Sequence, residues 1–77
     1  MLKKVVEFMV KELVEDSASV RVTQERKDKK IILAIHVDEQ DRGKVIGKGG
    51  ATIRSIRAVA SVLNEQEGYQ VLVDIAK

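Results

Sequence analysis

Hydrophobic residues in the first part of the chain recur with the period of an α-helix. The apolar positions are Leu2, Val5, Val6, Met9, Val10, Leu13 and Val14. Because they are spaced three and four residues apart, they share one face of a helix, which we expect to be buried. Phe8 lies beside this face, and we interpret it as widening the buried surface, with self-association as the alternative. Asp16 and Ser17 end the predicted helix.

The next two segments are typical of β-strands. Residues 18–26 alternate between apolar and polar side chains, whereas residues 31–37 are apolar at almost every position. A strand that is apolar on both faces is usually covered by neighbours, so we expect residues 31–37 to form the central strand. The basic residues between the two strands are Arg26, Lys27, Lys29 and Lys30. We interpret them as a solvated hairpin tip, whose short turn makes the two strands antiparallel.

The second half of the chain predicts two helices and one more strand. Acidic residues within 38–41 suit the start of a helix, and a short helical turn over residues 40–46 leads to a run of glycines. A longer helix is predicted from Thr52, and Gly68 is a natural stop for it. Its expected buried stripe is Ile53, Ile56, Val59, Ala60 and Leu63. Residues 69–75 alternate as a final strand.

The order of these elements predicts an α+β fold in a single domain, residues 1–77. The order is helix, strand, strand, helix, helix, strand. The connection through two helices is long enough to return the last strand parallel to the second one. We therefore expect a mixed three-stranded sheet with three helices on one face.

Charge is distributed unevenly along the chain. The net charge of the 77 residues is only +2, but residues 42–57 contain five basic and no acidic side chains. Such a local field attracts a polyanion even when the total charge is nearly neutral. No apolar run is long enough for a membrane span, and there is no cysteine. We expect a cytoplasmic location and no membrane partner.

The basic segment surrounds a distinctive glycine motif. Its sequence is Val45-Ile46-Gly47-Lys48-Gly49-Gly50-Ala51-Thr52-Ile53. Side chains at Gly47 and Gly50 would obstruct a phosphate chain that approaches the backbone, and Lys48 adds a mobile positive charge. The helix that follows directs its positive end at this loop.

This motif resembles the signature of the KH family, an apolar pair followed by Gly-x-x-Gly and, three positions on, an apolar residue. The element order is similar to the type II arrangement, and the short chain resembles the small bacterial KhpA-type proteins. The resemblance implies that the loop clamps about four nucleotides of single-stranded RNA. The candidate RNA-binding residues are Lys44, Val45, Ile46, Gly47, Lys48, Gly49, Gly50, Ile53, Arg54 and Arg57.

Within this set, the resemblance implies a groove for bases lined by Val45, Ile46, Ile53 and part of residues 31–37. We expect Lys48 and Arg54 to touch RNA, and Lys44 and Arg57 to steer its phosphates. The implied function is an RNA chaperone or post-transcriptional regulator without enzymatic activity. The implied partners are RNA and a second copy of the chain or a KhpB-type protein.

Other functions fit the residues less well. The glycine spacing matches neither a nucleotide-hydrolase phosphate loop nor a dinucleotide-binding turn. His36 and Asp38 are the nearest approach to a catalytic pair, and without a nucleophile we interpret them as structural. We expect no metal and no cofactor. A KH-fold protein-interaction module, a ribosome-assembly factor and a single-stranded DNA-binding protein remain as alternatives.

Overall fold

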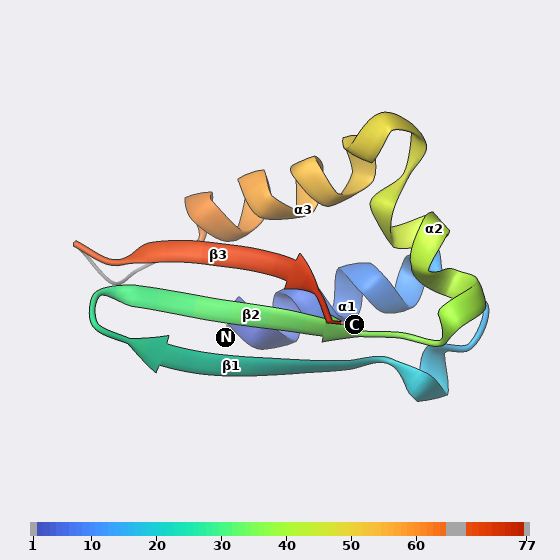
Figure 1. Cartoon of the computed structure of the whole chain (residues 1–77), viewed down its shortest axis with the longest axis horizontal. Coiled ribbons are helices and arrows are strands. Elements are labelled where there is room, and N and C mark those ends of the chain that lie inside the picture. Colours follow the sequence, from blue (N-terminus) through green and yellow to red (C-terminus); the bar gives the residue numbers. More distant parts are fainter. Residues whose placement is uncertain (1, 65–67, 77) are drawn as a thin grey trace.

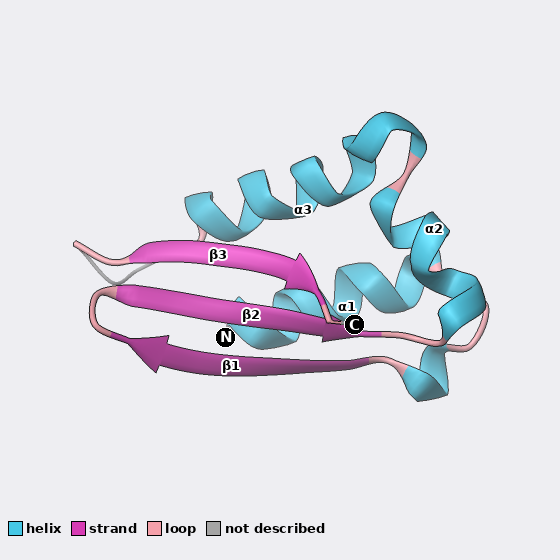
Figure 2. Ribbon diagram, in the orientation of Figure 1, coloured by secondary structure: helices cyan, strands magenta, loops and turns pink. Residues whose placement is uncertain are grey.

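The computed structural model, which describes residues 2–64 and 68–76, has the predicted α+β architecture. Its helices are α1 (Leu2–Leu13), α2 (Arg42–Ile46) and α3 (Ala51–Val62), and its strands are β1 (Arg21–Lys27), β2 (Lys30–His36) and β3 (Gln70–Ile75). Short 3-10 turns lie at η1 (Ser17–Ser19), η2 (Glu39–Asp41) and η3 (Lys48–Gly50). The helices gather against one face of the sheet (Figures 1 and 2).

The sheet has the predicted topology. Its order is β1-β2-β3, so β2 is central. β1 pairs antiparallel with β2, and Lys27 lies opposite Lys30 at the turn. β2 pairs parallel with β3, and Leu33 lies opposite Val73. The prediction of a mixed three-stranded sheet is therefore confirmed.

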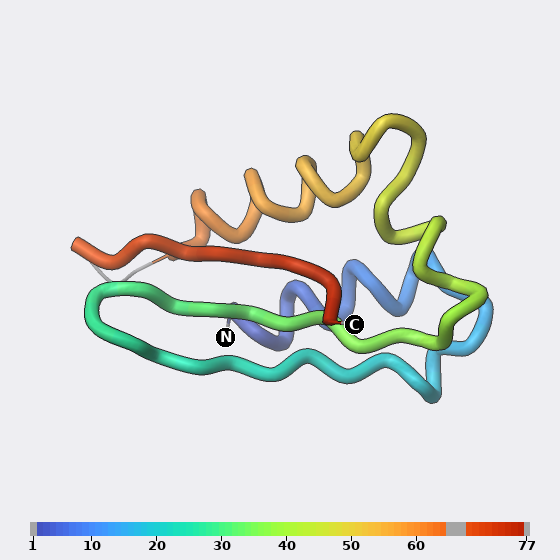
Figure 3. The backbone as a smooth tube through the Cα atoms, in the orientation of Figure 1, coloured from blue at the N-terminus to red at the C-terminus, as the bar shows by residue number. Residues whose placement is uncertain are grey.

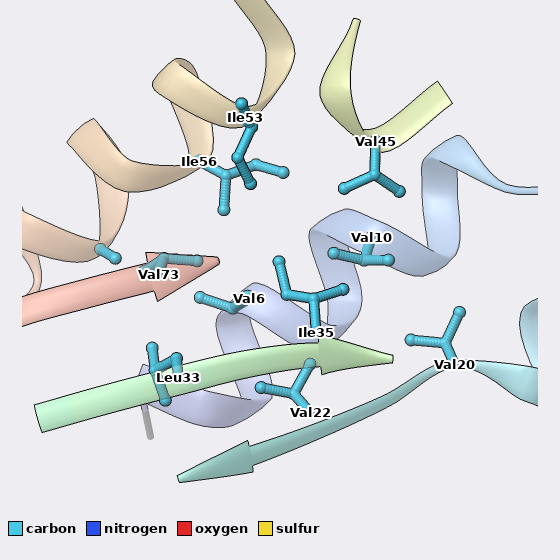
Figure 4. Packing of buried hydrophobic residues seen from close by; sticks show 11 residues of the cluster. Val6, Val10, Val20, Val22, Leu33, Ile35, Val45, Ile53, Ile56 and Val73 are labelled. Atoms are coloured by element: carbon cyan, nitrogen blue, oxygen red, sulfur yellow. The ribbon is translucent and has the colours of Figure 1, made fainter. Parts of the chain in front are cut away.

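One apolar core joins all three helices to the sheet. The side chains around it come from every α-helix and every strand (Figure 4). Its members are Val6, Val10, Val20, Val22, Leu33, Ile35, Val45, Ile53, Ile56, Ala60 and Val73. Because side chains alternate between the faces of a strand, Leu33 and Ile35 reach this core while Ala34 lies on the opposite face. No helix of the described residues lies on that opposite face (Figure 1).

Five expectations about local structure were wrong. Residues 17–19 form η1, so β1 begins at Arg21 and not at residue 18. The Ser19 hydroxyl donates to the Asp16 carboxylate over 2.7 Å, which favours a turn there. Phe8, Leu13 and Val59 are not buried, with 65%, 39% and 37% of their surfaces exposed. Helix α3 ends at Val62, well before Gly68.

Asp41 is a buried carboxylate that fixes the position of α2. Its side chain is 1% exposed and accepts the backbone N–H groups of Glu15 and Asp16, over 3.3 and 3.1 Å. The ammonium of Lys44 lies 3.4 Å away. The hydrogen bond from Asp16 is the main cause that lowers the pKa of Asp41, and it outweighs the opposite effect of burial. The carboxylate therefore ties the segment after α1 to the start of α2.

We expect Asp41→Asn to destabilise the fold at neutral pH. The pKa of Asp41 is lowered on folding, so its carboxylate stabilises the protein above the ordinary value of 3.8. That stabilisation is lost as the pH falls through the lowered pKa of the folded protein. In urea unfolding, the variant should therefore have a lower free energy of unfolding than the parent at neutral pH. The two values should become similar in acid.

The matched control is Asp38→Asn. Asp38 accepts the N–H of Glu39 over 3.0 Å at an exposed helix start, where asparagine caps equally well. A stability difference for Asp41→Asn that persists undiminished in strong acid would contradict the proposed ionic role.

Candidate nucleic-acid interface

The loop between α2 and α3 has a backbone that only glycines adopt readily. Gly47 has φ 77° and ψ 170°, a conformation almost restricted to glycine. Gly49 has φ 63° and Gly50 has φ 81°, both left-handed. The three glycines together reverse the chain between the end of α2 at Ile46 and the start of α3.

Gly47 is also required by space. A Cβ atom added there would lie 2.7 Å from Cβ and 2.8 Å from the backbone N of Thr52. A Cβ at Gly49 would meet nothing within 4 Å, and one at Gly50 would meet only the guanidinium of Arg54, at 3.0 Å. Thr52 was not among the predicted site residues, because a threonine at a helix start carries no signal that it packs on a preceding glycine.

The hydrogen bonds of the loop leave two donors available. Gly47 N–H donates to Gly43 O over 2.9 Å, and Gly50 N–H donates to Gly47 O over 3.1 Å. Within residues 2–64 and 68–76, no acceptor is found for the N–H groups of Lys48 and Gly49. Both precede α3, whose positive end favours an anion at this place. The exposed loop therefore offers backbone donors to a phosphate.

Arg54 and Lys48 have different roles beside these donors. The guanidinium of Arg54 donates to Gly49 O over 2.7 Å, so it braces the loop from the first turns of α3. Lys48 is exposed, and in the described part of the chain it makes no ion pair. Lys48 is thus an exposed cation without a carboxylate partner among the described residues, while Arg54 stabilises the loop.

The other cations of residues 42–57 are engaged within the protein. Lys44 lies 2.9 Å from the Glu15 carboxylate, and the hydrogen bond to Glu15 is the main cause that raises its pKa. Arg57 donates from Nε to Val73 O over 2.8 Å and lies 3.5 Å from the Asp74 carboxylate. Arg42 donates to Ala76 O. The positive field at the loop is therefore weaker than the sequence alone indicates.

The apolar residues beside the loop divide into core and surface. Val45 is fully buried and Ile53 is 6% exposed, and both side chains point into the core (Figure 4). Ile46 is 38% exposed. Val45 and Ile53 thus anchor the two helices that hold the loop, which leaves Ile46 as the accessible apolar side chain among the three.

His36 and Asp38 do not form a pair. His36 Nε2 lies 3.4 Å from the hydroxyl of Thr23. Asp38 instead accepts the N–H of Glu39 and, over 2.9 Å, the amide of Gln40. These contacts fit the structural interpretation of both residues. None of the helices in the described ranges has the length and apolar character needed to cross a membrane.

We expect Gly47→Ala to destabilise the protein more than Gly49→Ala, although both positions have positive φ. Alanine at Gly49 has to adopt a left-handed conformation, which lowers the free energy of unfolding by about 1 kcal/mol. Alanine at Gly47 would have to adopt a conformation that is almost restricted to glycine and would also conflict with Thr52, for a total cost of roughly 3 kcal/mol. Urea denaturation measures the difference, and equal losses for the two variants would show that Thr52 does not constrain Gly47.

Comparison with known proteins identifies the family of the chain. Residues 3–75 match the family model for the KH domain of KhpA and KhpB. The chain is 36% identical to the RNA-binding protein KhpA of Aquifex aeolicus, covering 96% of this chain and 94% of that protein. It is 35% identical to the RNA-binding protein KhpA of Bacillus subtilis, covering 96% of this chain and 91% of that protein. The chain therefore belongs to the KhpA/KhpB family of KH-domain proteins.

Proposed function

We propose that this protein binds single-stranded RNA through the loop of residues 47–50. The observation that carries the proposal is the exposed loop backbone, in which the N–H groups of Lys48 and Gly49 are directed to no acceptor in the described chain. Lys48 supplies the adjacent positive charge. The names of the relatives from Aquifex aeolicus and Bacillus subtilis, both RNA-binding proteins, support the same ligand.

Each residue beside the loop then has a distinct part in RNA binding. Gly49 and Gly50 allow the sugar–phosphate chain to approach the backbone, and Arg54 holds that backbone in place. Ile46 offers an apolar surface to a base. Arg57 and Lys44 act at longer range, because each already interacts with a carboxylate at the surface. Phosphates would have to compete with those carboxylates for direct contact.

We further propose that the cellular role is that of an RNA chaperone or post-transcriptional regulator in the cytoplasm, without catalytic activity. A loop that clamps about four nucleotides makes few contacts, so a single domain binds weakly. A second copy of the chain or a KhpB-type protein would add a second site and raise the avidity through effective concentration. The family to which the chain belongs includes both KhpA and KhpB.

The double variant Lys48→Asp/Gly49→Asp tests the proposed site. Aspartate tolerates the left-handed conformation at Gly49 better than most residues, so the fold should persist in circular dichroism. Placing carboxylates among the phosphate donors should weaken RNA binding roughly tenfold or more at low salt. Fluorescence anisotropy with a labelled single-stranded RNA measures the affinity.

The matched control is Lys3→Asp/Ala18→Asp. It changes the net charge by the same amount at exposed positions in α1 and η1. If the loop variant is folded and binds RNA as tightly as the parent and the control, the loop is not the binding site. A single-stranded DNA of the same sequence, bound equally well, would show that the 2′-hydroxyl is not read.

A further inference from the structure

Unpaired positive charge gathers at the hairpin tip, defined here as residues 26–30. Its basic side chains are Arg26, Lys27, Lys29 and Lys30, and all four residues are exposed. Asp28 is its one acidic residue, so four basic and one acidic side chains give the tip a net charge of +3. In the ranges that the structure describes, none of the four forms an ion pair. Among the described residues, two of the five cations within 42–57, Lys44 and Arg57, face carboxylates, whereas no cation of the tip does.

The pairing of the strands brings two of these charges together. Lys27 lies directly opposite Lys30 in the register of β1 and β2. Like charges at directly opposed positions destabilise a sheet, so neither lysine is explained by the stability of the hairpin. A bound anion would remove this repulsion.

The tip also has an aromatic neighbour. The guanidinium of Arg26 lies 5.7 Å from the centre of the Tyr69 ring, just before β3 begins. Gln70 N–H donates to Lys29 O over 2.8 Å, which fixes the start of β3 against the turn. Arginine planes and aromatic rings are the surfaces on which proteins stack unpaired bases. The tip therefore combines phosphate-binding charge with a place for a base.

The tip and the glycine loop lie near opposite ends of the molecule, whose longest dimension is 35 Å (Figure 3). α3 and β3 run between them (Figure 1). Along this route α3 carries Arg54 and Arg57, and 46% of the Arg57 side chain is exposed. A strand that leaves the loop along α3 thus passes one more partly exposed cation before it reaches Tyr69 and Arg26.

We propose that the hairpin tip is a second RNA-contacting site, which binds the phosphates of the same strand that the glycine loop holds. This inference rests on the proposed function. The loop alone accounts for about four nucleotides. At roughly 3.4 Å per stacked nucleotide, a strand that spans the molecule needs about ten nucleotides. Binding should therefore strengthen with RNA length well beyond the footprint of the loop.

The test compares Lys27→Gln/Lys30→Gln with the parent on uridine oligomers of about five and about fifteen nucleotides. The short oligomer fills the loop but does not reach the tip, so the variant should bind it as the parent does. The long oligomer should bind the variant roughly tenfold more weakly at low salt. The slope of log affinity against log salt should become shallower by about 1.4 for the two lost phosphate contacts.

The matched control is Lys11→Gln/Arg21→Gln, which removes the same charge from α1 and from the far end of β1. It should bind both oligomers like the parent. The tip variant should unfold at the same temperature as the parent or higher, since the opposed Lys27 and Lys30 no longer repel each other. Weaker binding then cannot be ascribed to loss of folding.

Three results would overturn the proposal: unchanged binding of the long oligomer by the tip variant, an equal loss for both oligomer lengths, or an equal loss in the control. The loop variant Lys48→Asp/Gly49→Asp separates the two claims. If it keeps full affinity for the long oligomer while the tip variant loses affinity, the proposed function of the loop fails and the tip is the RNA site. If the parent binds neither oligomer, both claims fail.

Discussion

The position of the candidate interface depends on one close contact, that of the Gly47 backbone with Thr52. Only a residue without a Cβ atom can lie against the first turn of α3 at this distance and with this backbone conformation. Val45 and Ile53 are buried on the two sides of the contact, so the core determines the directions of both helices. The loop between them is thereby exposed, while buried side chains on both sides hold its ends in place. A phosphate-binding loop needs both properties, since an ordered backbone loses little further entropy when a ligand binds.

Asp41 extends this constraint to the rest of the fold. α2 has only five residues, too few to be stable as an isolated helix. The carboxylate of Asp41 holds its start to the backbone after α1, and Val45 holds its buried side. A polar and an apolar anchor thus act on neighbouring turns of one short helix. Stability in acid and the placement of the glycine loop are therefore coupled through a single carboxylate.

The sequence predicts well what depends on periodicity and poorly what depends on individual side-chain contacts. The apolar periods predict α1, α3 and the central strand, the acidic residues before α2 predict its start, and the length of the connection predicts the parallel return of β3. Phe8 was misplaced because it lies next to the buried face of α1. Neighbouring positions on a helix can differ completely in burial, and the apolar pattern does not define the edge of the buried face that closely. Residues 17–19 were misplaced because hydrogen bonds accepted by the carboxylates of Asp16 and Asp41 bend a segment whose alternation indicates a strand. The glycines of the loop were recognised from the motif, but the contact with Thr52 requires coordinates.

The availability of the basic side chains is what the sequence alone predicts least well. The basic cluster of residues 42–57 has charge +5 in the sequence, yet Lys44 and Arg57 face carboxylates, while Arg42 and Arg54 donate to backbone carbonyls. Lys48 forms no ion pair in the described part of the chain, so the proposed binding at the loop would rest on backbone dipoles more than on side-chain charge. Dipoles act only at short range, and contacts of this kind with a few nucleotides give modest affinity. Useful affinity then requires further contacts, either along the same strand or from a second domain, because linked sites multiply weak binding constants.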